Sequence, residues 1–254
     1  MLSYMTQIFA VLLALSSIHA ADSDPKATAH IKKSEEHTRG KSLESNVTMI
    51  VDRNGKTRTL KFKMWTQGRD KAVVKIYEPV KERDTGNLRL DLNLWQYLPN
   101  IDRLVKVPPS MMLQSWMGSQ FTNDDLVRTS SLTTDYTHKI EKNEKVGEYE
   151  TVKIICTPKP TAPVVWGKVI EWVRVTDSVP VKREMYSETG TLVKRMEGAH
   201  IKTFGSHTVP TQMTMIDVKN PSNKTVMKYD EVKFDQPIDA GIFTQSFLSK
   251  PLQM

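Results

Sequence analysis

The chain has 254 residues, of which 39% are hydrophobic and 26% charged, so it is long and apolar enough to form a folded core. Its 36 lysines and arginines outnumber its 29 acidic residues and give a formal net charge of +7. This balance favours contact with acidic surfaces such as anionic lipid headgroups, although plain solubility explains it equally well. The basic residues are scattered and form no long block interleaved with aromatic residues, which argues against nucleic-acid binding.

The first twenty residues have the pattern of a secretory signal peptide. Residues 8–15 form a short apolar run, and the small residues that follow lead to a predicted cleavage site after Ala20. The run is too short for a permanent membrane anchor, and no cysteine stands at the cleavage point to carry a lipid. No composition break divides the rest of the chain. We therefore expect an exported, unanchored and monomeric protein with a single domain at residues 21–254.

Cys156 is the only cysteine of the chain, which excludes an intramolecular disulfide and a metal site built on several thiolates. It lies in a strand-like run, residues 152–156, and we interpret it as a buried, inert thiol. A reactive thiol would need a nearby base, and the sequence points to none.

The chain begins with a polar segment and then alternates between polar and apolar residues. Residues 22–40 end at Gly40, which predicts either a frayed segment or a short helix with a glycine stop. From Leu43 onward the period is two, and Asn54-Gly55 is a strong hairpin signal. Even spacing and short turns predict a large curved antiparallel sheet or a barrel. Strands are expected from Leu43 to the hairpin turn and at 60–64, 72–77, 87–90, 94–98, 147–156, 164–175, 179–187, 191–204, 207–218 and 224–234.

Two segments interrupt this alternation. Pro109 and Gly118 stand where a first helical residue and a helix stop belong, which predicts a short helix over residues 109–117. Its apolar side chains point to nearly every side, so the helix either packs in the core or forms a lid over an apolar cavity. Thr122 and Asp125 then form a pattern typical of a capping box, and residues 239–243 predict a final helical turn.

The sequence contains no familiar catalytic or metal-binding pattern. Asp124 and Asp125 are adjacent at a helix start, where a capping or dipole role is sufficient. Ser115 and Ser119 do not lie in a G-x-S-x-G motif, and the six histidines lack metal-binding spacing. We therefore expect no enzyme, no metal and no cofactor.

Two motifs resemble the LolA-like group of outer-membrane lipoprotein-sorting proteins. Residues 94–99 read LWQYLP, and residues 116–126 read WMGSQFTNDDL, with Arg103 between them. The resemblance extends over roughly residues 40–247. The family usually has an acid where this chain has Gln120, so no role of that acid carries over.

The resemblance implies a mainly β fold with a few short helices, in which a half-open β-barrel is closed by helices over an apolar cavity. It also implies a periplasmic carrier of lipid or lipoprotein acyl chains that works beside an exporter of the resistance–nodulation–division type. The alternative is a sensory or adaptor module of the same fold that binds a membrane protein. The expected ligand-binding residues are Leu60, Phe62, Met64, Trp95, Tyr97, Met111, Met112, Leu113, Trp116, Met117, Phe121 and Leu126.

Overall fold

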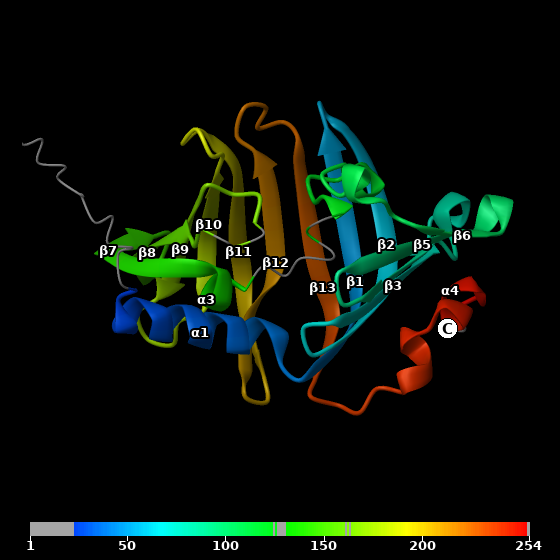
Figure 1. Ribbon diagram of the computed structural model, residues 1–254, viewed down its shortest axis with the longest axis horizontal. Helices are drawn as coiled ribbons and strands as arrows, with labels where there is room; N and C mark the ends of the chain where they lie inside the picture. The colour runs from blue at the N-terminus through cyan, green and yellow to red at the C-terminus, as the bar shows by residue number, and fades with distance from the viewer. Residues whose placement is uncertain (1–22, 124, 126–130, 161, 163, 253–254) are drawn as a thin grey trace, which may run out of the picture.

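The computed structural model describes residues 23–123, 125, 131–160, 162 and 164–252. Its described strands form one 13-stranded sheet in the order β6-β5-β4-β3-β2-β1-β13-β12-β11-β10-β9-β8-β7 (Figure 1). The strands are β1 (Ser42–Arg53), β2 (Lys56–Gln67), β3 (Lys71–Glu78), β4 (Gly86–Leu90), β5 (Asn93–Leu98), β6 (Arg103–Lys106), β7 (Tyr136–Val146), β8 (Tyr149–Pro158), β9 (Lys168–Arg174), β10 (Pro180–Tyr186), β11 (Leu192–Phe204), β12 (His207–Asp217) and β13 (Lys224–Phe234). Neighbouring strands are antiparallel and the sheet does not close, which confirms the predicted fold class.

The hairpin between β1 and β2 follows directly from its turn sequence. Asn54 and Gly55 both have positive φ values, 52° and 79°, which the tight hairpin turn requires and which Asn and Gly adopt at low cost. Arg53 pairs with Lys56 across the turn. This register places Val47, Met49, Val51, Leu60 and Phe62 on the same face.

The sequence pattern does not predict two of the strands, β6 and β7. Both lie at edges of the sheet, where only one side of the strand pairs with another described strand. Along β7, buried Tyr136 and His138 give way to charged residues, so the apolar alternation is too sparse to signal a strand. Pairing with a neighbouring strand therefore stabilises both: β7 pairs with β8, and β6 pairs with β5.

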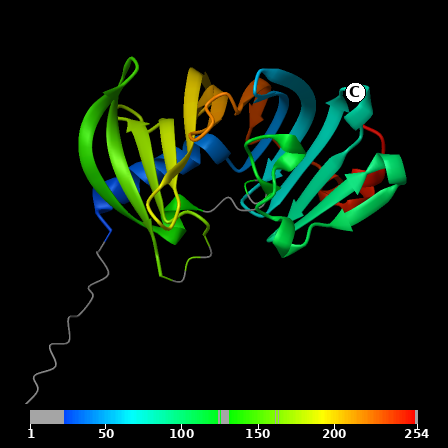
Figure 2. The same cartoon turned by 90° about the horizontal axis from the view of Figure 1, so that it is seen from above.

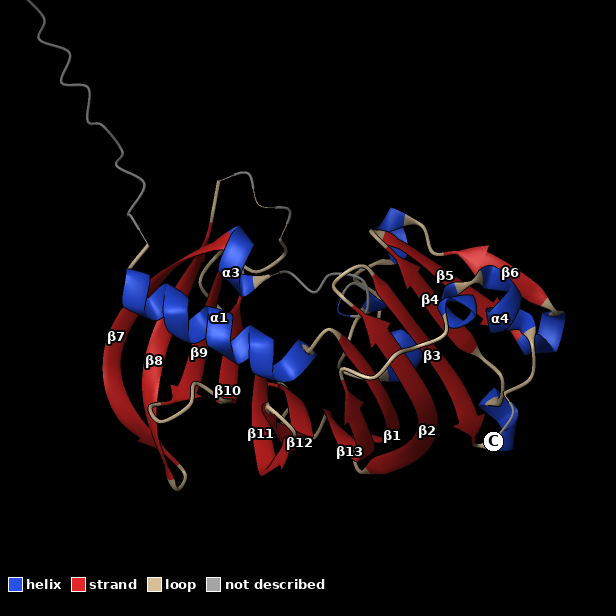
Figure 3. Cartoon of the chain, turned by 90° about the horizontal axis from the view of Figure 1, so that it is seen from below, coloured by secondary structure: helices blue, strands red, loops and turns tan. Residues whose placement is uncertain are grey.

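Helix α1 (Pro25–Arg39) covers the inner, concave face of the sheet over its β7–β12 half (Figure 3). Of the two forms predicted for residues 22–40, the helix is the one observed. The Asp24 side chain accepts a hydrogen bond from the Lys26 N–H at the start, and Gly40 takes a positive φ of 60° at the end. Ala27 and Ile31 are fully buried against the strands.

The opposite, outer face of β3–β5 is covered by the C-terminal segment. A 3₁₀ turn at Ala240–Phe243, which agrees with the predicted final turn, leads into α4 (Gln245–Ser249). Phe243 and Leu248 are buried there. The buried Lys75 ammonium donates to the carbonyl oxygens of Leu248 and Lys250, and so fixes the segment to the sheet.

The predicted helix over residues 109–117 is wrong as a continuous element. Two separate 3₁₀ turns, Pro109–Met111 and Trp116–Gly118, stand in its place. Ser115 is extended and pairs with Thr122, while Met117 has a positive φ of 48°, and neither conformation fits an α-helix. A short helix, α3 (Leu132–Asp135), lies beside α1. Among the described residues, no helix has the length and apolar character needed to cross a membrane.

Candidate ligand cavity

The inner face is left partly uncovered where α1 ends. A cavity of about 270 Å³ lies there, partly open to solvent, between the end of α1, strands β1–β5 and β13, and the segment after β6. Figure 2 shows that segment lying within the curve of the sheet. Most of the apolar wall of the cavity consists of alternate residues of neighbouring strands, since every second side chain of a strand faces the same side. The wall residues from the strands include Met64, Ala72, Val74, Leu94 and Met227, and Phe121 joins them from the segment after β6.

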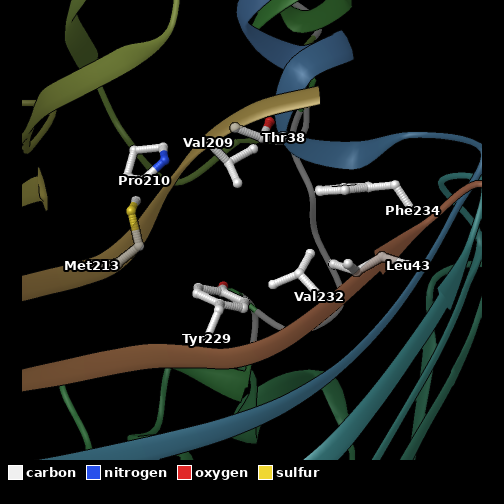
Figure 4. Close-up of a pocket in the computed structure, with 8 residues that line it drawn as sticks. All are labelled: Thr38, Leu43, Val209, Pro210, Met213, Tyr229, Val232 and Phe234. Atoms are coloured by element: carbon white, nitrogen blue, oxygen red, sulfur yellow. The ribbon is translucent and has the colours of Figure 1, made fainter. Parts of the chain in front are cut away.

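A second cavity of about 110 Å³ lies where β12 and β13 diverge (Figure 4). Their pairing runs only from Gln212–Lys228 to Ile216–Lys224, although both strands continue beyond Gln212 and Lys228. Pro210 stands beyond the last pair and has no N–H to donate. Side chains of the diverging ends line the gap, among them Val209, Met213, Val232 and Phe234. Thr38, Leu43 and Tyr229 line both cavities, so the two adjoin.

Trp116 closes the inner face beside the larger cavity. It is 1% exposed, and its ring meets Phe62 edge to face with 5.5 Å between the centroids. Its indole N–H donates to Asn87 Oδ1 over 3.1 Å. Of the two interpretations of the Met-rich segment, Trp116 fits core packing, because its whole side chain is enclosed by the sheet.

Hydrogen bonds donated by backbone N–H groups hold the segment around Trp116 in place. The Trp116 N–H donates to the Phe121 carbonyl over 2.8 Å, and the Gln120 N–H donates to Thr225 Oγ1 of β13 over 2.9 Å. The capping box is confirmed, because the Thr122 N–H donates to Asp125 Oδ2 over 2.6 Å and the Asp125 N–H donates to Thr122 Oγ1 over 3.1 Å. This wall of the cavity is therefore tied to both β13 and β4.

The lining of the larger cavity also contains polar groups. Asn87 and Arg89 reach it from β4, and Arg39 reaches it from the last turn of α1. Burial lowers the pKa of the Arg39 guanidinium, and Glu35 opposes that effect. Burial also lowers the pKa of Arg89. The cavity is thus apolar over most of its wall and cationic at the end of α1.

The expected ligand-binding residues divide between several places. Leu60, Phe62, Met64, Trp116, Met117 and Phe121 all join one inner-face cluster. Within it, Met64 and Phe121 line the larger cavity. Met112 packs nearby against Leu94 and Val107, whereas Met111 and Leu113 are 41% and 63% exposed. Leu126 lies outside the described residues.

Trp95 and Tyr97 are not brought to the cavity. Both lie on the outer face of β5, in the cluster under the C-terminal segment. Leu94 occupies the next position along the strand and faces the cavity instead. The alternation thus identifies two faces correctly but does not tell which one is concave.

Sequence reasoning misses several lining residues. Leu43, Met227 and Tyr229 lie in predicted strands, and alternation alone could have included them. Arg39 and Asn87 carry no local signal, because they come to one cavity only through the long-range placement of the end of α1 and of β4 on the same face of the sheet.

The remaining reactive groups lie away from the cavity. The thiol of Cys156 is buried under α1, and burial raises its pKa, which agrees with an inert thiol. Within the part of the chain that the structure describes, no group of three or more His, Cys, Asp or Glu side chains is arranged to hold a metal ion.

Three solved structures are similar to the chain. A DUF1329 family protein from Desulfovibrio piger is 20% identical, covers 89% of this chain and 99% of its own, and has a TM-score of 0.81. A domain from Vibrio parahaemolyticus, named as an outer membrane lipoprotein-sorting protein, is 18% identical with the same coverages and a TM-score of 0.77. A LolA superfamily protein from Nitrosomonas europaea is 23% identical, covers 87% and 98%, and has a TM-score of 0.72.

These TM-scores establish the shared fold, and with it the LolA-like resemblance predicted from the sequence. No significantly similar sequence is found among curated proteins. A protein-family model described as "-like: Uncharacterized protein" matches residues 68–250, which is most of the chain. The chain therefore belongs to the family of that model, and its fold is that of the LolA-like lipoprotein-sorting proteins.

Proposed function

We propose that the protein is a periplasmic carrier that binds an apolar ligand, a lipid or lipoprotein acyl chain, in the cavity on the inner face. The observation that carries this proposal is the pair of adjoining cavities with apolar walls. Water gains few hydrogen bonds in such a space, so an aliphatic chain that displaces it is favoured. We propose that the protein acts by binding, without catalysis.

The proposed location rests on the N-terminal pattern. The Ser23 hydroxyl accepts a hydrogen bond from the His138 N–H over 2.8 Å, and the Asp24 N–H donates to the His138 carbonyl over 2.8 Å. Cleavage after Ala20 would leave these contacts in the mature, single-domain protein. A net charge of +7 suits a carrier that approaches anionic headgroups, whether alone or beside an exporter of the resistance–nodulation–division type.

A neutral fluorescent probe, 1-N-phenylnaphthylamine, tests the cavity directly. Ala72 lines the larger cavity from β3, so Ala72→Phe puts an aromatic ring into that space while keeping a residue that suits a strand. We expect wild-type protein to enhance the probe's emission and the variant to lose most of that enhancement. Native mass spectrometry of protein purified from the periplasm should also detect a lipid-sized adduct, on a chain that begins at Ala21.

Lys71→Phe is the matched control. It introduces the same ring one position away, on the outer face of the same strand, where Lys71 is exposed. We expect it to bind the probe as wild type does. Equal binding by wild type, Ala72→Phe and Lys71→Phe would mean that the probe binds outside the cavity. If wild type did not bind the probe at all, that result would contradict the carrier function.

The sensory or adaptor function remains the second candidate. Exposed apolar side chains near the β6 edge, Ile101, Val105 and Leu113, favour it as a docking surface. This function predicts a stable membrane-protein partner in a pull-down from membranes. It also predicts that native mass spectrometry detects the protein without a lipid-sized adduct.

A further inference from the structure

We propose that the cavity selects an amphiphile with an anionic oxygen group, a carboxylate or a phosphate, on an aliphatic chain, and that Arg39 and Asn87 receive this group. The inference rests on the proposed carrier function and names the class of its ligand. Three observations carry it: an unpartnered buried donor, a cation at the same cavity, and acidic neighbours that are already engaged.

Asn87 is the unpartnered donor. The side chain is 3% exposed and lines the cavity, and its Nδ2 has no hydrogen-bond partner among the residues that the structure describes. Its orientation is fixed by Trp116, because an indole N–H can only donate and must therefore face the amide oxygen. The amide N–H groups are left to face another acceptor. A buried donor without an acceptor costs free energy, and a ligand oxygen would recover it.

Arg39 supplies positive charge at the same cavity. Its half-buried guanidinium lines the wall, and burial lowers its pKa. The guanidinium groups of Arg69 and Arg89 lower it further. An anion placed here would be attracted to several cations and little screened by salt, because the site is partly enclosed.

Two acidic groups of this region, Glu35 one turn before Arg39 in α1 and Asp125 in the cavity lining, are already engaged. Glu35 Oε2 accepts from Arg69 over 3.0 Å, from the Ser131 hydroxyl over 3.0 Å and from the Thr133 hydroxyl over 2.9 Å. Asp125 accepts from Thr122, and its carboxylate lies 3.9 Å from the Lys194 ammonium. Neither acid is therefore placed to neutralise Arg39 alone, and the cavity keeps a cationic end.

The size and lining of the cavities favour one aliphatic chain. Leu43 and Tyr229 line both cavities and connect the cationic end to the gap between β12 and β13. Taken together, the two adjoining cavities lie near the lower end of the about 300–1,000 Å³ that is common for ligand sites. A single-chain anionic amphiphile fits this space better than a ligand with several chains.

Competition against 1-N-phenylnaphthylamine tests the inference. The competitors are dodecanoate, dodecyl phosphate, neutral dodecanol and inorganic phosphate, each added to the full mature chain. We expect wild type to bind the two anionic amphiphiles roughly tenfold more tightly than dodecanol, the size of one charge-assisted hydrogen bond. Arg39→Gln should remove most of this preference and leave dodecanol binding unchanged. Arg39→Lys, which keeps the charge, should restore part of it.

Lys32→Gln is the matched control. It removes one positive charge from the same helix, at an exposed side chain whose ion pair with Glu36 is 4.0 Å long. We expect it to keep the wild-type preference. Equal affinities of wild type for dodecanoate and dodecanol would overturn the inference and leave the carrier function standing. Competition by inorganic phosphate alone would also overturn it, since the chain would then be unnecessary. Failure of the neutral probe and dodecanol to bind at all would contradict the carrier function itself.

Discussion

At the scale of single residues, buried hydrogen bonds on the inner face determine the shape of the cavity wall. Trp116 holds Asn87 in its orientation, and Asn87 joins the segment after β6 to β4. Trp116→Phe keeps an aromatic ring beside Phe62 but removes the donor that Asn87 Oδ1 accepts from. We expect the free energy of unfolding to fall by about 1–3 kcal/mol, measured by urea denaturation.

The double variant Trp116→Phe/Asn87→Leu is the control for this prediction. It removes both polar partners at once, so no buried amide is left unsatisfied. We expect its loss of stability to be smaller than the sum of the losses of the two single variants. If Trp116→Phe had the same free energy of unfolding as wild type, the hydrogen bond would contribute nothing to stability.

His138 makes stability depend on pH. The ring is 3% exposed, its Nε2–H donates to the Leu132 carbonyl over 2.7 Å, and burial lowers its pKa from 6.5. The unfolded chain therefore binds this proton more readily than the folded protein. The contribution of neutral His138 to stability is fully present above pH 6.5. It is lost as pH falls below 6.5, towards the lowered pKa of His138 in the folded state.

His138→Gln tests that dependence, since glutamine can still donate to Leu132 but does not titrate. We expect the variant to lose less stability than wild type between pH 7.5 and 5.5, in urea titrations at each pH. His30, whose pKa is also lowered by burial, contributes with the same sign and is unchanged in the comparison. Identical losses in both proteins would contradict the assignment to His138.

At the scale of elements, the C-terminal segment stabilises the outer face and stays clear of the cavity. Leu248 is fully buried among Trp65, Val73 and Leu88. Leu248→Ala should lower the free energy of unfolding by about 2–5 kcal/mol, because it leaves a space that the sheet cannot close. Probe binding on the inner face should not change.

Leu92→Ala removes the same side chain from a position that is 74% exposed. We expect a change within about 0.5 kcal/mol in urea denaturation. A weaker affinity of Leu248→Ala for the probe would mean that the two faces are coupled.

Most elements could be predicted because their signals are local. Alternation marks the central strands, and Asn54-Gly55 marks the first hairpin. The helix expected at 109–117 fails because the positive φ of Met117 and the Ser115–Thr122 bridge depend on contacts with the rest of the fold. Local propensity cannot anticipate such contacts.

The cavity could be predicted only in part. Met64 and Phe121, two of the predicted ligand-binding residues, line it and belong to the inner cluster, and their role in binding stays a prediction. Trp95 lies on the outer face, and the sequence does not indicate this because the two faces of a strand look alike until the curvature of the sheet is known. The cationic end depends on where the end of α1 and strand β4 lie around the cavity, which no local pattern records.

At the scale of the whole molecule, one uninterrupted sheet joins the two ends of the chain. Strand β1 pairs with β2 on one side and with β13 on the other, so the first and last strands hold the sheet together at its middle. One junction near this middle, the pairing of β12 with β13, is short for two 11-residue strands, because it runs only from Gln212–Lys228 to Ile216–Lys224 beside the smaller cavity. The strength of that junction decides whether the halves on either side unfold together.

We expect a single unfolding transition, because separating the sheet between β12 and β13 would expose unpaired strand edges and the apolar residues that line the gap. Circular dichroism, calorimetry and tryptophan fluorescence should give the same midpoint, since Trp65 and Trp116 report on one side of the junction and Trp172 on the other. A bound amphiphile should raise that one midpoint as a whole. Hydrogen exchange that releases β9 well before β2, or two calorimetric peaks, would instead mean that the junction separates two cooperative units.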